Sequence, residues 1–315
     1  MSKQWQCMQD RVTAYLRYRR QLGYRLAIEG AQLQRFAAFA HQYGHHGPLT
    51  LAIVLAWAGA SRTPFGPARR LEVIRPFAKY CQLFEPDTAV PPTGLLGPGH
   101  RRVPPHIYTS EELDALLAAA KTLQPRDGLR PVTIHTYLGL LAATGLRVSE
   151  GLALNRQDVD LDRGMITVRC GKFGKARQVP LDPSTVTALA GYCKRRDHEA
   201  PWVHDDAFFC FDNARRVNYD QASYAFQCLR RQLGWERNTA RLPRMYDLRH
   251  TFACRRLRQW YEDGVDVNWA LPQLSTYLGH VKVSDTYWYL TAVPELMAIV
   301  TDRFEHYTSG GQRHE

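Results

Sequence analysis

The sequence predicts a mainly α-helical fold with a small antiparallel β section, divided into two domains. The chain has 315 residues, which is long enough for about two domains with separate cores. Hydrophobic residues make up 45% of it and recur mostly at helical spacing. Residues 86–105 are rich in proline and glycine. Because such a stretch cannot continue a helix or a central strand, it predicts a boundary between two domains.

This boundary predicts a small helical domain over residues 1–88, a linker over 89–105 and a larger mixed α/β domain over 106–315. The first domain should be a helical bundle, because apolar residues recur there with the helical period. The stretches that show this pattern are residues 33–43, 49–60 and 68–84.

The second domain should begin with helices, pass through a short β section and end in helices. Thr109 and Glu112 have the spacing of a capping box, so a helix should start there. A second helix should run from Pro131 to Gly145. Helical patterns dominate again from residue 184. The remaining predicted elements are strands at 165–170 and 177–181, a turn at 171–175 and a helix at 248–261.

The charge of the chain indicates a polyanionic partner, nucleic acid before membrane. The formal net charge is +11 and the sequence pI about 9.4. Residues 1–104 hold 14 Lys and Arg against 5 Asp and Glu, whereas the remaining residues hold 27 against 25. The first domain therefore resembles a DNA-gripping module. Candidate phosphate contacts are Arg17, Arg19, Arg20 and Arg25, although solvated helix faces would carry the same residues.

Cysteines and motif spacing argue against several other classes of protein. The seven cysteines are scattered without a Cys-x-x-Cys pair, which is not typical of a disulfide framework or a zinc site. We expect no metal site and no cofactor. GKFGKA (171–176) lacks the spacing of a P-loop, and DVDLDRG (158–164) lacks the glycine of a calcium loop. No stretch has the length of a signal peptide core or a membrane span, so we expect a cytoplasmic protein.

Five residues of the second domain suit chemistry at a phosphodiester: Arg147, Lys172, Arg249, His280 and Tyr289. Ionising a tyrosine at pH 7 costs about 4 kcal/mol, so a tyrosine nucleophile needs cations or a proton acceptor nearby. Two arginines can hold phosphate oxygens and stabilise the transition state. A lysine can protonate the leaving oxygen, and a histidine can donate or relay a proton. The set therefore fits attack by a tyrosine on DNA without a metal.

In its motifs the chain resembles the tyrosine recombinases of the phage integrase family. The resemblance rests on ATGLRVSE (143–150), GKFGKARQVPL (171–181), YDLRHTFA (246–253) and LGH (278–280). It implies catalytic roles for Arg147, Arg249 and His280, and it places Glu150 at a supporting acidic position. For the lysine, the spacing from Arg147 favours Lys172 over Lys175. The family places its nucleophile nine residues after the histidine, which selects Tyr289 over Tyr287.

The resemblance also implies an activity and partners. The protein would cleave and rejoin double-stranded DNA through a 3′-phosphotyrosine, without ATP or metal, for integration, excision or transposition. A core-binding domain and a catalytic domain would together clamp duplex DNA. The protein would act as a homo-tetramer, in which the C-terminal segment of one subunit docks on a neighbouring subunit. The protein would work in a prokaryotic cytoplasm. Two alternatives remain open: a type IB topoisomerase and a DNA-binding homologue that has lost catalysis.

One position departs from the family pattern. The box that holds Arg249 usually begins with a histidine three residues earlier, and here that residue is Tyr246. A tyrosine hydroxyl could still bond a phosphate oxygen. We therefore include Tyr246 as a candidate supporting residue, and its part in proton transfer stays open.

Overall fold

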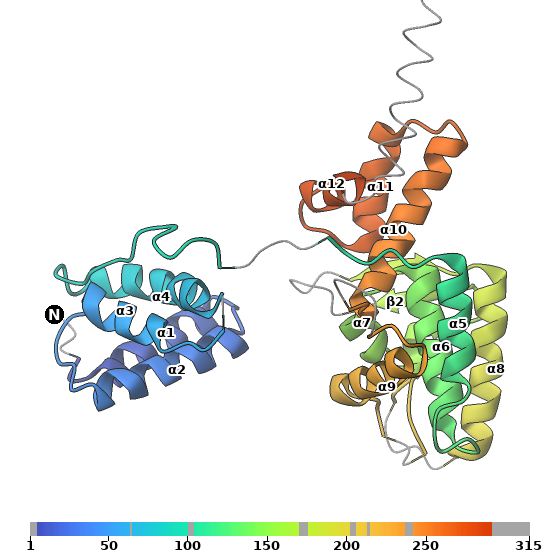
Figure 1. Ribbon diagram of the computed structural model, residues 1–315, viewed down its shortest axis with the longest axis horizontal. Coiled ribbons are helices and arrows are strands. Elements are labelled where there is room, and N and C mark those ends of the chain that lie inside the picture. Colours follow the sequence, from blue (N-terminus) through green and yellow to red (C-terminus); the bar gives the residue numbers. More distant parts are fainter. Residues whose placement is uncertain are drawn as a thin grey trace, which may run out of the picture. The chain divides into compact units, whose positions relative to one another are not determined.

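The structure is a computed structural model, and its helices and strands are shown in Figure 1. It describes residues 5–63, 65–99, 104–169, 176–201, 206–212, 215–236 and 242–291. The chain divides into two compact units, residues 1–103 and 104–315. The described residues are mainly helical with one small antiparallel sheet, which confirms the predicted fold class. No helix within these ranges has the length and apolar character needed to cross a membrane.

The first unit is a bundle of helices around an aromatic core. Phe77 lies against Tyr15 and Phe36, with ring centroids 5.6 and 6.4 Å apart, and Phe36 also meets Trp57. Most of the periodic apolar residues predicted from the sequence form this core, whereas Tyr43, at the end of the stretch 33–43, is 65% exposed. The described helices of the unit are α1 (Met8–Gln21), α2 (Ala27–Gln42), α3 (Leu51–Gly59) and α4 (Gly66–Gln82).

Part of the proline-rich stretch packs on this bundle. Arg75 of α4 donates hydrogen bonds to the carbonyls of Pro91 and Pro92, both at 3.0 Å. The backbone N–H of Ala89 donates to the carbonyl of Leu49. The carbonyls of both prolines are thus paired with an arginine side chain, as backbone acceptors away from regular secondary structure require.

The second unit places a small sheet beside a group of helices. In Figure 1, α5, α6 and α8 run side by side, and α10 leads into α11 and α12. The sheet has the order β1-β2-β3 with both pairs antiparallel. The described helices are α5 (Ser110–Ala120), α6 (Leu129–Thr144), α7 (Val148–Leu152), η1 (Arg156–Asp158), α8 (Pro183–Glu199), α9 (Tyr219–Gln232), α10 (Met245–Glu262), α11 (Val267–Leu278) and α12 (Ser284–Thr291). The strands are β1 (Val159–Asp160), β2 (Met165–Val168) and β3 (Arg177–Pro180).

Helix starts show where local sequence was sufficient and where it was not. Helix α5 begins at the predicted capping box, in which Thr109 Oγ1 accepts from the Glu112 N–H at 3.1 Å. Helix α6 begins two residues earlier than predicted. The Asp212 carboxylate, 83 residues away in sequence, accepts from the Leu129 N–H there. A distant carboxylate thus caps this helix, which spacing along the chain cannot reveal.

A separate apolar cluster holds the last three described helices together. It contains Leu257 of α10, Leu271 and Leu278 of α11, and Tyr289 of α12. The candidate nucleophile therefore lies in a packed cluster that α10 joins to the rest of the unit.

We predict that Phe77→Ala strongly loosens the first unit. Removing a ring from a filled core should lower the free energy of opening by about 3–5 kcal/mol. Native-state hydrogen exchange of peptides from α1, α2 and α4 measures this free energy. The control is Ile28→Ala, because Ile28 is 70% exposed and its loss should cost under about 0.5 kcal/mol. Equal exchange in the two variants would contradict the prediction.

Candidate active site

Three chain segments that lie far apart in sequence meet in the second unit. They are the junction of α6 and α7, the first turns of α10, and the end of α11 with α12. The first two segments carry Arg147 and Arg249, and the third carries His280 and Tyr289. The structure therefore brings together four of the five residues singled out from the sequence.

Arg147 immediately precedes α7 and is held by two hydrogen bonds from its guanidinium. Nη1 donates to Glu150 Oε1 at 2.6 Å, and Nη2 donates to the Gly279 carbonyl at 2.9 Å. Gly279 ends α11 with a φ of 68°, a conformation that favours glycine. A helix C-terminus carries partial negative charge, so it is a favourable place for this cation.

Glu150 is a buried carboxylate, and each of its two oxygens accepts two hydrogen bonds. It accepts from the Arg147 side chain and N–H, and it accepts two bonds from Arg177 at 3.0 and 2.8 Å. Burial by itself would raise the pKa of Glu150. The hydrogen bonds from Arg177 and Arg147 outweigh it and lower the pKa to about 2. Glu150 is therefore ionised at neutral pH and binds two cations.

Arg249 is one of the most deeply buried side chains, with 1% of its surface exposed. Its Nη1 donates to the Gly145 carbonyl at 2.8 Å, and its Nη2 donates to the Leu278 carbonyl at 2.7 Å. Nη2 also lies 3.0 Å from His280 Nε2. Its Nε is buried and makes no hydrogen bond within the described residues. Buried donors are nearly always paired, so this atom can still take an acceptor from outside the described residues.

The hydrogen bonds of His280 define its tautomer. An arginine nitrogen can only donate, so Nε2 of His280 must accept from Arg249. The proton is then on Nδ1, which donates to Thr286 Oγ1 at 2.7 Å. Burial, and then the charges of Arg249 and Arg147, lower the pKa of His280 to about 4. His280 is therefore neutral at physiological pH, with its Nε2 lone pair directed at the guanidinium.

Tyr289 lies beside these groups with only 2% of its surface exposed. Its ring stacks on His280, with centroids 5.9 Å apart, and meets His250 edge to face at 5.1 Å. Burial raises the pKa of Tyr289, and the neighbouring Arg249 lowers it without cancelling that effect. The hydroxyl is thus protonated at neutral pH. Tyr287, the other tyrosine of the motif, is 49% exposed.

Tyr246 lies on the first turn of α10 and is 45% exposed. Its ring meets His250 edge to face at 5.0 Å, and His250 in turn meets Tyr289. Tyr246 is thus close to the site but separated from the buried tyrosine by a histidine. Its functional role stays a prediction.

The remaining candidate residues lie outside this group. Lys172 and Lys175 fall outside the described residues. In the first unit, Arg17, Arg20 and Arg25 are exposed, whereas the guanidinium of Arg19 covers the ring of Tyr24 at 3.8 Å. The exposed arginines are available for phosphates, and their part in DNA binding stays a prediction.

Among the side chains that contact the candidate groups without having been identified from the sequence are Thr286 and Arg177. Thr286 fixes the tautomer of His280, and Arg177 binds Glu150. Neither belongs to a residue type that marks a site by itself, since a threonine in a helix and an arginine on a strand are usually surface residues. Only their distances in the fold reveal them.

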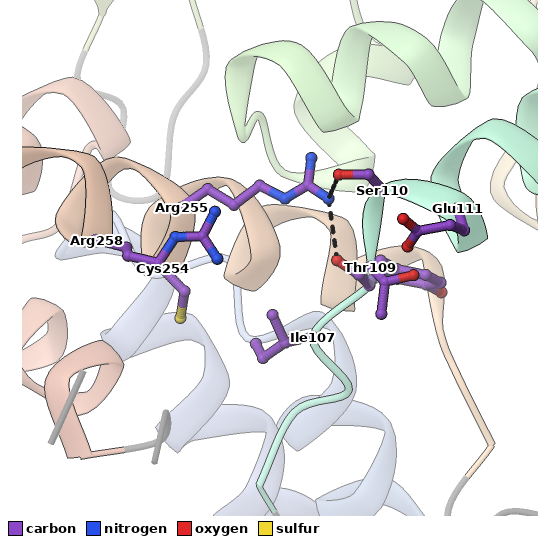
Figure 2. Close-up of a pocket in the computed structure, with 8 residues that line it drawn as sticks. Ile107, Thr109, Ser110, Glu111, Cys254, Arg255 and Arg258 are labelled. Carbon is purple, nitrogen blue, oxygen red and sulfur yellow. Dashed lines mark hydrogen bonds between the residues drawn. The ribbon is translucent and has the colours of Figure 1, made fainter. Parts of the chain in front are cut away.

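The described residues also contain a pocket. Figure 2 shows it between the segment before α5 and the middle of α10, with Arg255 donating to Tyr108 and Ser110. Arg258 lines it as well. None of the four catalytic candidates lines this pocket, although Cys254, which does, has its Sγ 3.9 Å from the Tyr289 carbonyl oxygen. Within the described ranges, no group of three or more metal-binding side chains is present.

Comparison with known proteins identifies the family. The family model described as "Phage integrase family" matches residues 107–295. A putative integrase/recombinase, y4rB of Sinorhizobium fredii, is 40% identical over 93% of this chain and 96% of its own. The chain belongs to the phage integrase family. The resemblance seen in the sequence is thereby confirmed, and the chain is a DNA breaking and rejoining enzyme of the tyrosine recombinase class.

Other known proteins are also similar to this chain. Tyrosine recombinase XerA of Pyrococcus furiosus is 31% identical over 59% of this chain and 57% of its own. Among solved structures, the Tn1549 transposon integrase in complex with circular intermediate DNA has a TM-score of 0.65. It is 16% identical over 95% of this chain and 99% of its own. XerH recombinase bound to difH has a TM-score of 0.64 at 15% identity, over 89% of this chain and 78% of its own. These structures share the fold of the family.

We predict that His280 makes the stability of the protein depend on pH between its ordinary pKa of 6.5 and its pKa in the folded state of about 4. In this window the unfolded chain binds a proton that the folded chain does not. The free energy of unfolding should therefore fall as the pH falls from 6.5 towards 4.

Urea denaturation at pH 7 and pH 5 measures this dependence. His280→Gln should show a smaller loss of stability between the two pH values than the wild type. The control is His198→Gln, which removes an exposed histidine from α8 and should keep the wild-type loss. An unchanged loss in His280→Gln would show that the histidine is not held neutral.

Proposed function

We propose that this recombinase cleaves one DNA strand with the hydroxyl of Tyr289, forms a 3′-phosphotyrosine and then transfers the strand to a new 5′-hydroxyl. The observation that carries the proposal is the convergence of Arg147, Arg249, His280 and Tyr289 around one buried guanidinium donor that has no acceptor within the described residues. A phosphate oxygen has the charge and the acceptor capacity that this donor requires.

In this proposal the two arginines bind the scissile phosphate. Arg249 is fixed by carbonyls on two helices, so it is oriented before DNA binds. Arg147 is fixed by Glu150 and Gly279 in the same way. Groups that are already oriented lose little free energy to reorganisation when charge develops on the phosphorane-like transition state. The arginines thereby supply the electrostatic stabilisation that a metal ion could otherwise supply, and the reaction needs neither metal nor ATP.

The proton of Tyr289 must leave when its oxygen attacks phosphorus. We assign its acceptor as Nε2 of His280, because that ring is neutral and stacks on the tyrosine. For this transfer the hydrogen bond from Arg249 Nη2 to Nε2 must first break, which frees the lone pair of Nε2 to take the proton. The bond from Tyr289 to phosphorus forms, the bond to the 5′-oxygen breaks, and Lys172 donates a proton to that oxygen. Rejoining reverses these steps.

The first unit would bind the DNA duplex through its basic surface. Residues 1–104 carry most of the net positive charge of the chain, and Arg17, Arg20 and Arg25 are exposed there. We propose that four copies of the chain, two on each of two DNA duplexes, form a homo-tetramer. The relatives named integrase or recombinase, and a transposon integrase of the same fold, support integration, excision or transposition of mobile DNA as the biological role.

We predict that Tyr289→Phe abolishes covalent attachment to DNA. A nicked suicide substrate releases the short 5′ fragment after cleavage and so traps the phosphotyrosine, which denaturing electrophoresis detects. Tyr287→Phe is the matched control, because Tyr287 is two residues away and exposed. It should retain the wild-type yield of adduct. An adduct with Tyr289→Phe would exclude this residue as the nucleophile, and no adduct with the wild type would exclude the reaction itself.

We predict that Lys172→Ala slows cleavage by about 10²–10⁴-fold, the usual contribution of a general acid. Lys175→Ala should stay close to the wild-type rate. A substrate with sulfur in place of the bridging 5′-oxygen should restore the rate of Lys172→Ala, because a thiol has a pKa of about 8.5 and its thiolate leaves without a proton. A loss that sulfur does not restore would show that Lys172 binds phosphate instead. A loss in Lys175→Ala alone would assign the general acid to Lys175.

A further inference from the structure

Arg177 follows the two candidate lysines in the sequence. It is the first residue of β3, and it pairs with Val168 in the last pair of the β2–β3 ladder. Lys172 and Lys175 lie between these two residues in the sequence. The side chain of Arg177 is only 12% exposed, which is unusual for an arginine on a short strand.

The Arg177 guanidinium joins three parts of the second unit. Nη1 and Nη2 donate to the two oxygens of Glu150, at 3.0 and 2.8 Å. Nε donates to the Tyr277 carbonyl near the end of α11, at 2.8 Å. A bidentate arginine–carboxylate pair fixes orientation as well as distance. The strand β3 is therefore tied to α7 and to α11 by one side chain.

The end of α11 packs closely against this guanidinium. A Cβ atom on Gly279 would lie 2.9 Å from Nη1 of Arg177, so a larger residue would displace the arginine. Gly279 directly precedes His280, and its carbonyl accepts from Arg147. Arg177 thus packs at the point where the segments of His280 and Arg147 meet.

We propose that Arg177 is a positioning residue for DNA cleavage: by binding Glu150 and the Tyr277 carbonyl, it holds β3 at a fixed distance from Arg147 and from the end of α11 that leads to His280. This inference rests on the proposed cleavage reaction. Arg177 acts through Glu150 and the backbone, since its guanidinium donates to that carboxylate and to the Tyr277 carbonyl. Glu150 stays bound to Arg147 when Arg177 is removed, but β3 is then no longer tied to that pair.

The test compares Arg177→Gln with Arg163→Gln on the nicked suicide substrate. Arg163 lies in the turn between β1 and β2, and its side chain is 84% exposed. Misplacing catalytic groups by about 1 Å can cost about 100-fold in rate, so we expect a loss of that order for Arg177→Gln at saturating DNA. The Kd for DNA, measured separately at the same salt concentration, should change by less than about threefold. Arg163→Gln should match the wild type in both measurements.

A double-mutant cycle with Glu150→Gln separates positioning from a general loss of structure. If Arg177 acts through Glu150, Arg177→Gln should slow cleavage much less in the Glu150→Gln background than in the wild type. Arg177→Lys keeps the charge but cannot make all three hydrogen bonds. It should lose rate as well, and it replaces Arg177→Gln in the cycle if thermal melting shows that the glutamine variant does not fold.

Two results would overturn the inference. One is cleavage by Arg177→Gln at the wild-type rate with saturating DNA. The other is an equal loss of rate in both backgrounds, which would show that Arg177 acts independently of Glu150. Both require that the wild type and Arg163→Gln form the adduct. If the wild type forms none, the proposed cleavage reaction has failed, and this result is distinct from either of the other two.

Discussion

The site depends on holding several guanidinium groups close together without losing their orientation. Like charges in a low-dielectric interior repel strongly and lose hydration, so each must be paired. In this protein the Glu150 carboxylate binds Arg147 and Arg177, and backbone carbonyls at the ends of α6 and α11 bind Arg147 and Arg249. The helix ends serve two purposes. They accept hydrogen bonds, and their partial negative charge offsets the arginines. The fold thus holds several positive charges close together at one place.

This constraint also accounts for the protonation states within the site. Burial, and then the two cations beside His280, make its charged form unfavourable, so the ring is neutral and its Nε2 accepts from Arg249. Thr286 completes the arrangement by accepting from Nδ1. Tyr289, buried beside them, keeps its proton. The site therefore holds a protonated candidate nucleophile, Tyr289, and a neutral histidine, next to a buried arginine. In our proposal, substrate binding itself starts the proton transfer.

Particular residues show how far the sequence could be interpreted. The capping box of Thr109 and Glu112 and the apolar periodicity of the first unit are local patterns, and both led to correct helices. The start of α6 depends on Asp212, and that of α10 on Asp247, which accepts from the Arg244 N–H. Asp212 is distant in sequence from the helix that it caps. Asp247 is close in sequence to the start of α10, but the sequence analysis did not identify it as a cap. The family's spacing favoured Tyr289 over Tyr287 as the nucleophile, and that choice stays a prediction; in the fold Tyr289 is buried and Tyr287 is 49% exposed.

The sequence by itself determined the family, the residue types of the site and their order along the chain, because the motifs around Arg147, Arg249 and His280 are local and specific. Tertiary structure alone decided how these residues interact. Arg177, Thr286 and the Gly145 and Leu278 carbonyls come from segments whose spacing gives no sign that they meet. Hydrogen bonds act over about 3 Å, and packing of whole helices sets those distances. The tautomer of His280 and the burial of Arg249 follow from that packing.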